Sequence, residues 1–143
     1  MTQVDFYILQ QHEPEKACLY ACRLAEKAFQ RGHRIAIRCG SEAQAQRMDE
    51  LLWSFRADSF LPHSAEAQDK DNDPILVTHG NIPLDHHDLL INLALDVAPD
   101  CSRFQRVCEI VCQQEDWLQA CRRRWVHYRD RGYPLKKHDV QQN

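Results

Sequence analysis

The sequence predicts a three-layer α/β/α domain with a mostly parallel sheet, Rossmann-like but without a nucleotide site. Short apolar segments of strand length alternate with longer segments of helical period, and the first strand–helix pair is followed directly by a second. This order implies right-handed crossovers between parallel strands. Residues 1–143 are expected to form one domain, because neither a linker nor an internal repeat interrupts the pattern.

The first half of the chain supplies two strands and two helices. Residues 4–9 (VDFYIL) form an apolar run typical of a strand covered on both faces. A helix is predicted from Pro14, where a proline costs no hydrogen bond, to Gly32, a common helix stop. A second strand is predicted at residues 34–39. The helix that follows spans residues 41–55 and begins with a Ser-x-x-Gln capping box.

The second half begins with an irregular segment and a polar loop at residues 65–73. Three further strands are predicted at residues 74–78, 89–95 and 106–112. For the last of these a helix is the competing interpretation, because Cys108 and Cys112 are four residues apart. The final helix follows it and ends near Gly132.

Composition limits the possible functions. A formal net charge of −3 argues against general binding to a nucleic-acid backbone. The first residues lack the pattern of a signal peptide, and the apolar runs are too short to span a bilayer. Seven cysteines, mostly within apolar periodic segments, are expected to be reduced and buried. We therefore expect a cytoplasmic protein without membrane association.

Motifs for catalysis or for cofactor binding are weak. Four glycines, no two of them close together, leave no dinucleotide fingerprint and no phosphate-cradling loop. Neither the cysteine pairs spaced four apart nor the adjacent His86 and His87 match a paired metal-ligand motif. No local signature surrounds a serine or cysteine nucleophile. We expect no cofactor, no metal and no enzymatic activity, with an α/β enzyme of unknown substrate as an alternative.

The predicted last helix combines basic and aromatic residues. At 100° per residue, one narrow stripe should face the core: Trp117, Cys121 and Tyr128. A neighbouring strip holds Leu118, Arg122 and Arg129, and Trp125 lies at the border between the two strips. Arginine forks bind carboxylates and an indole offers flat apolar area, so this strip suits an acidic, partly apolar ligand. The alternative is a solvated basic face.

A second candidate surface lies where the second helix meets the irregular segment. It contains Trp53, Phe55, Phe60, Leu61 and Pro62. Tryptophan and phenylalanine in a loop-rich region are typical of protein interfaces, although part of this cluster must belong to the core.

Several segments resemble one known family. They are the strand VDFYIL, the strand entry at residues 31–34, QAQRMDELLWSFRADSFLPH at 44–63, LLINL, RVCEIV, and the ending RRRWVHYRDRGYPL. In this order, over nearly the whole chain, they resemble the chi subunit of bacterial DNA polymerase III holoenzyme. The resemblance implies a nucleotide-binding-like α/β fold that binds no nucleotide, and a non-enzymatic adaptor in DNA replication.

The resemblance also implies two partners. One is the psi subunit, bound one-to-one, which tethers chi proteins to the clamp loader. The psi-binding surface would be formed by Trp53, Phe60, Leu61 and Pro62. The other partner is the acidic C-terminal tail of single-stranded DNA-binding protein, on the opposite side of the molecule.

The residues implied for tail binding are Val111, Arg122, Trp125, Val126 and Arg129. Three positions depart from the family pattern: Trp125 is usually tyrosine, and Val126 and Leu118 replace basic residues. Arg123 and Arg124 add charge, on other parts of the predicted helix surface. Direct binding of single-stranded nucleic acid is a further alternative, which the acidic balance disfavours.

Overall fold

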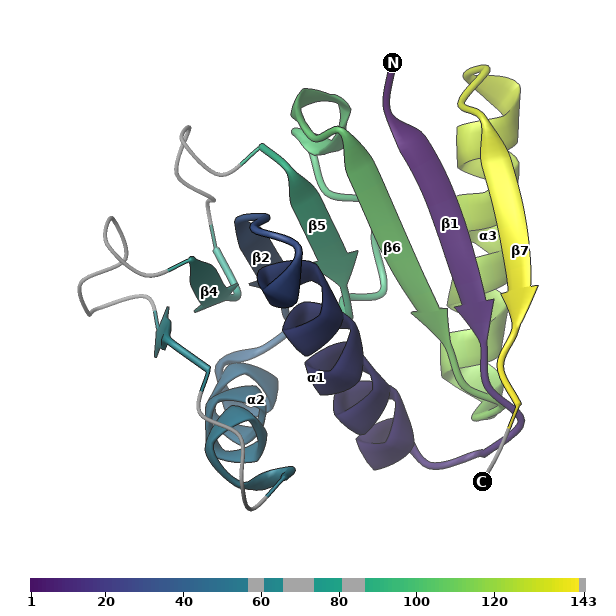
Figure 1. Ribbon diagram of the computed structural model, residues 1–143. Coiled ribbons are helices and arrows are strands. Elements are labelled where there is room, and N and C mark those ends of the chain that lie inside the picture. Colours follow the sequence, from purple (N-terminus) through teal and green to yellow (C-terminus); the bar gives the residue numbers. More distant parts are fainter. Residues whose placement is uncertain (57–60, 66–73, 81–86, 142–143) are drawn as a thin grey trace.

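A computed structural model describes residues 1–56, 61–65, 74–80 and 87–141. Within these ranges, seven strands form a single sheet in the order β3-β4-β2-β5-β6-β1-β7, and every pairing is parallel (Figure 1). The strands are β1 (Gln3–Ile8), β2 (Ile35–Arg38), β3 (His63–Ala65), β4 (Ile75–Thr78), β5 (Leu89–Asn92), β6 (Arg106–Val111) and β7 (Leu135–Asp139).

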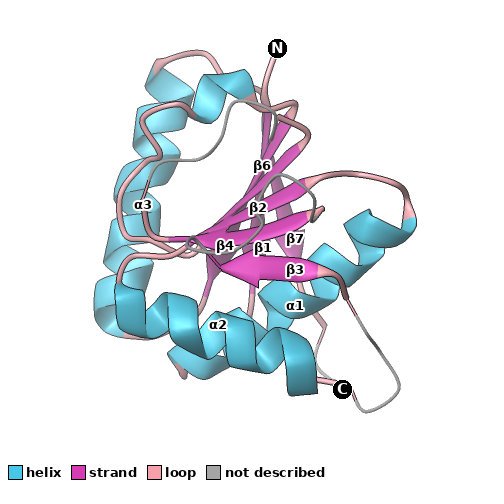
Figure 2. Cartoon of the chain, turned by 90° about the vertical axis from the view of Figure 1, so that its left-hand side faces the viewer, coloured by secondary structure: helices cyan, strands magenta, loops and turns pink. Residues whose placement is uncertain are grey.

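Three α-helices from the described part of the chain cover the sheet: α1 (Pro14–Gln30), α2 (Glu42–Ser54) and α3 (Glu115–Asp130). The first two lie side by side on one face and α3 lies on the other (Figures 1 and 2). A short 3-10 helix, η1 (Cys101–Arg103), connects β5 to β6. The predicted three-layer α/β architecture is therefore confirmed.

The predicted elements are found with small shifts at their ends. Residues 106–112 contain strand β6, so the competing helix interpretation was wrong. Strand β6 is covered on both faces, and the five residues after Arg106 are all buried. Strand β5 is shorter than predicted and ends at Asn92. The Asn92 side-chain oxygen accepts the Ala94 N–H at 3.3 Å, which turns the chain out of the sheet.

Two strands escaped prediction, β3 and β7, and both lie at the edges of the sheet. Strand β7 reads LKKHD and has no apolar alternation, because it is half-buried or exposed along its length. An edge strand needs only one paired side and commonly carries charge, so its sequence gives little strand signal.

The helix ends follow the predicted capping chemistry. Pro14 opens α1, and Ser41 caps α2 by accepting the Gln44 N–H at 3.1 Å. The Gln44 side chain in turn accepts the Gly40 N–H at 2.7 Å, one residue earlier than in a standard capping box. After α3 the chain reverses through Gly132 at φ 81°, a conformation that favours glycine.

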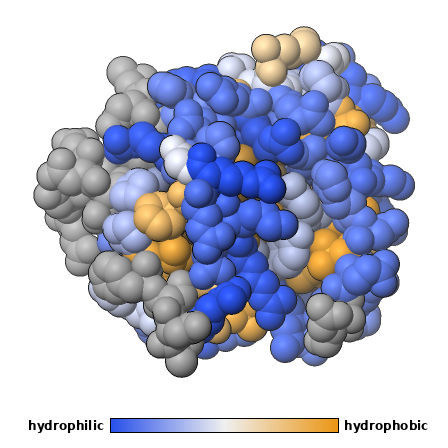
Figure 3. Space-filling view, viewed as in Figure 1, coloured by the Kyte–Doolittle hydropathy of each residue, from blue (hydrophilic) through white to orange (hydrophobic). Residues whose placement is uncertain are grey.

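All seven cysteines are free thiols and buried, as predicted. Burial raises the pKa of Cys22 and of Cys108 to about 12, so both thiols stay protonated at neutral pH. On the face that carries α1 and α2, the surface is largely hydrophilic, with small separate apolar patches (Figure 3).

Candidate protein-binding surfaces

Helix α3 is held on the sheet by its predicted core stripe. Its N-terminus is capped by Gln114, whose side-chain oxygen accepts the Trp117 N–H at 2.9 Å. The Trp117 indole N–H donates to the Ile110 carbonyl at 2.8 Å, while Tyr128 is fully buried. These contacts fix how the opposite, solvent-facing flank of the helix is presented.

A buried polar network also anchors α3. Glu109 on β6 is fully buried and accepts hydrogen bonds from Arg124 at 3.0 Å, the Tyr128 hydroxyl at 2.7 Å and Asn92 at 3.1 Å. The Arg124 guanidinium also donates to the Leu95 carbonyl at 2.9 Å. Burial, and then the negative charge of Glu109, raise the pKa of Tyr128 well above its usual range.

The placement of Arg124 corrects the sequence analysis, which put it on the helix surface. Its exposed fraction is only 3%. Arg124 lies seven residues after Trp117 and four before Tyr128, so its helical phase matches the core stripe. The burial of Arg124 could therefore have been predicted from the helical period. The carboxylate that stabilises its buried charge, Glu109, comes from strand β6 and could not.

The predicted tail-binding residues of α3 lie together on one flank. Arg122 and Arg129 are exposed, Val126 is 41% exposed and Trp125 is half-buried. The Trp125 ring packs edge-on against Phe6 of β1, with ring centroids 5.1 Å apart. Arg129 contacts Asp130 at 3.2 Å, but both side chains are largely exposed, so this pair is weak and exchangeable.

Val111, the fifth predicted tail-binding residue, is placed differently. It is 4% exposed at the end of β6, in register with Ile8 of β1. Val111 therefore belongs to the apolar layer beneath α3, whereas the four helical residues form the accessible flank.

The predicted psi-binding residues separate into accessible and buried groups. Trp53, at the end of α2, is 55% exposed, and its ring lies 4.7 Å from that of His63. Leu61 is only 3% exposed, Pro62 is half-buried, and Phe60 lies outside the described residues. Trp53 and Pro62 thus offer the accessible apolar area of this surface.

Sequence reasoning missed the support that His63 gives to Trp53. The buried His63 ring makes a hydrogen bond with the Leu61 carbonyl at 2.7 Å and lies 3.1 Å from the Asp49 carboxylate. This arrangement anchors the segment after α2 against the last turns of that helix.

A pocket lies at the C-terminal ends of β2 and β5, where related folds bind nucleotides. It is lined by Ser41, Asp96, Asp116 and Trp117, among others. Two carboxylates would repel a phosphate, and the helix starts beside it are already capped by their own side chains, Ser41 and Gln114. These features disfavour a nucleotide at this position.

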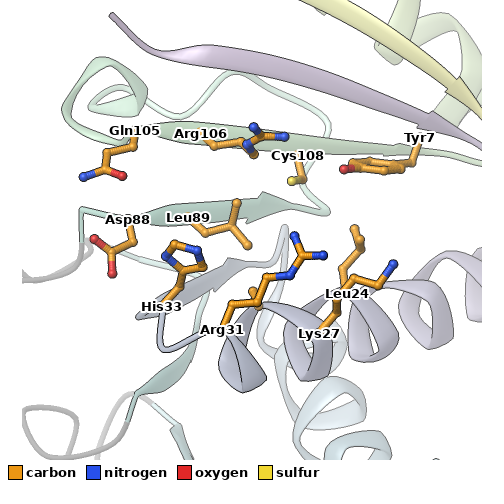
Figure 4. Close-up of a pocket in the computed structure, with 11 residues that line it drawn as sticks. Tyr7, Leu24, Lys27, Arg31, His33, Asp88, Leu89, Gln105, Arg106 and Cys108 are labelled. Carbon is orange, nitrogen blue, oxygen red and sulfur yellow. The ribbon is translucent and has the colours of Figure 1, made fainter.

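A second pocket, of about 390 Å³, lies between the last turns of α1 and the first residues of β5 and β6 (Figure 4). Lys27, Arg31 and Arg106 contribute positive charge, but Arg106 is paired with the buried Asp5. The Cys108 thiol in this pocket is protonated at neutral pH, which makes it a poor nucleophile.

No helix in the described part of the chain is long and apolar enough to cross a membrane. Across the same residues, histidine, cysteine and acidic side chains form no cluster of three or more that could hold a metal ion.

Comparison with known proteins supplies the family. The model of the family described as DNA polymerase III chi subunit, HolC, matches residues 1–136 of this chain. This chain belongs to the chi family. The DNA polymerase III subunit chi of Pseudomonas aeruginosa is 41% identical over 138 residues, covering 96% of each chain.

Two further chi subunits are more distant. That of Haemophilus influenzae is 31% identical over 138 residues, covering 95% of this chain and 96% of the relative. The chi subunit of Escherichia coli is 30% identical over 124 residues, covering 80% of this chain and 79% of the relative. The resemblance inferred from the sequence segments is thus confirmed, and membership of the chi family supports an accessory role in DNA replication.

Proposed function

We propose that this chi-family chain is a non-enzymatic adaptor that binds two partners at once. One is the acidic C-terminal tail of single-stranded DNA-binding protein, and the other is the psi subunit of the clamp loader. The observation that carries the first assignment is the common flank of Arg122, Trp125 and Arg129, where cations border an accessible indole.

The chemistry of the tail fits this flank. An acidic peptide that ends in an apolar residue offers carboxylates to Arg122 and Arg129. Its terminal apolar side chain can pack on Trp125 and Val126, which are partly exposed. So small an interface corresponds to micromolar affinity, about −8 kcal/mol.

Titration of a tail peptide into the protein tests this proposal. Arg122→Ala should weaken binding several-fold at low salt, and Trp125→Ala should weaken it further. Arg123→Ala is the matched control, because Arg123 is exposed on the same turn but points about 100° away. Raising salt should weaken wild-type binding, since screening acts over about 8–10 Å. Unchanged affinity in both Arg122→Ala and Trp125→Ala would refute the assignment.

The psi-binding surface is proposed around Trp53 and Pro62, supported by the exposed indole at the end of α2. Trp53→Ala should abolish co-purification with psi while the isolated protein stays folded, because more than half of the side chain is exposed. Leu95→Ala is a suitable control, as Leu95 is similarly exposed, at 53%, elsewhere on the surface. Retention of psi by the Trp53 variant would place the interface elsewhere.

A further inference from the structure

Lys137 on the edge strand β7 projects toward the same side of the sheet as α3. Strands β1 and β7 are parallel, with Phe6 opposite Lys137 and Tyr7 opposite His138. Residues opposite each other in adjacent strands project to the same face, and successive residues alternate. His138 stacks on Tyr7, with centroids 4.6 Å apart and planes at 12°, on the face away from α3. Lys137 must therefore project to the Phe6 face.

The same register places Lys137 beside the proposed tail site. Phe6 carries the Trp125 ring at 5.1 Å, and β7 lies one strand spacing, about 4.8 Å, further out. In Figure 1, α3 runs behind β1 and β7, at the same end of the sheet. We call the surface that runs from the proposed tail-binding flank of α3 to β7 the α3–β7 surface. Lys137 is exposed, and no ion pair to it is found within the described ranges.

We propose that the acidic peptide lies across the α3–β7 surface, with Lys137 as a third cation of the site. This inference rests on the proposed tail binding. On α3, Val126 is apolar and Arg129 makes only a weak, exposed contact with Asp130, so the tail residues proposed on this helix supply two cations, Arg122 and Arg129. Lys137 supplies positive charge from the opposite side of Trp125, which lets carboxylates flank an apolar side chain on both sides.

Asp139 sets a limit to this site. It lies two residues beyond Lys137 on the same face of β7 and is exposed. Its carboxylate would repel acidic residues, so the peptide carboxylates should gather near Lys137 on the α3–β7 surface.

Strand alternation provides a matched pair of variants. Lys136 and Lys137 are adjacent and both exposed, but they point to opposite faces of the sheet. A fluorescent peptide of the last ten residues of the single-stranded DNA-binding protein would be titrated into wild type and into the Lys136→Ala, Lys137→Ala, Arg122→Ala and Trp125→Ala variants. Lys137→Ala should weaken binding roughly three- to five-fold at low salt, with the difference shrinking at high salt. Lys136→Ala should leave the affinity unchanged.

The outcomes separate this inference from the function on which it rests. If Arg122→Ala weakens binding and Lys137→Ala does not, the tail binds α3 but does not extend across the α3–β7 surface. Equal losses in the two lysine variants would indicate general electrostatic attraction and also overturn the inference. If wild type does not bind, or Arg122→Ala and Trp125→Ala both bind like wild type, the proposed function itself fails. Melting curves should be unchanged for both lysine variants, because both side chains are exposed.

Discussion

Replacing Arg124 with methionine tests whether the buried network under α3 is essential for stability. The substitution keeps much of the side-chain volume but removes the charge that faces Glu109, with both partners at 3% exposure or less. Glu109 would keep its hydrogen bonds from Asn92 and Tyr128. It would nevertheless become an uncompensated buried carboxylate.

Removing one partner of a buried ion pair typically costs 3–5 kcal/mol. Because two neutral donors remain on Glu109, we expect the lower end, about 3 kcal/mol. For a domain stable by about 5–15 kcal/mol, that is a large fraction. A second substitution, Glu109→Gln, removes the uncompensated charge. The free energy of unfolding of the double variant should therefore be about 1–3 kcal/mol higher than that of Arg124→Met.

Urea denaturation followed by tryptophan fluorescence measures these free energies, since Trp117 is buried and its indole N–H donates to the carbonyl of Ile110, the residue after Glu109. The double-mutant cycle would compare wild type, both single variants and the double variant at one pH. Wild-type stability in Arg124→Met would refute the reasoning. A double variant that is less stable than Arg124→Met would also contradict it, because the uncompensated charge would then not be the cause.

Two other predictions concern stability. Burial raises the pKa of Cys18 and Cys121 to about 11 and that of Cys108 to about 12, above the ordinary thiol value. The contribution of these thiols to the free energy of unfolding is fully present below the unfolded-state pKa of about 8.5. It is lost as pH rises toward 11–12, by up to about 1.4 kcal/mol per pH unit for each thiol. Urea denaturation at pH 8, 9 and 10 should show this decline in stability, and a stability that does not change with pH would contradict it. Gly132→Ala should lower the free energy of unfolding by about 1 kcal/mol, because φ is 81° at this position although a Cβ would meet no other atom. Gly132→Asn should lower it less, since asparagine adopts positive φ more readily. Equal melting temperatures for wild type and the alanine variant would contradict this backbone strain.

Much of the fold could be predicted because its signals are local. Apolar runs marked the inner strands, and Pro14, Ser41 and Gly132 marked helix ends through their own backbone chemistry. The core stripe of α3 followed from helical period alone. Strand β7 gave no such signal, because a charged edge strand depends on its neighbour β1 for pairing.

The candidate tail site likewise combines features that the local sequence predicts with features that depend on tertiary packing. The sequence by itself determined the family pattern, the order of the elements and the common flank of Arg122, Trp125 and Arg129, since all of these depend on spacing within one segment. Only the tertiary structure decided that Arg124 is buried and that Lys137 borders the flank. The first depends on Glu109 of β6 and the second on the register of β7 with β1. Such pairings between distant segments are set by packing of the whole sheet.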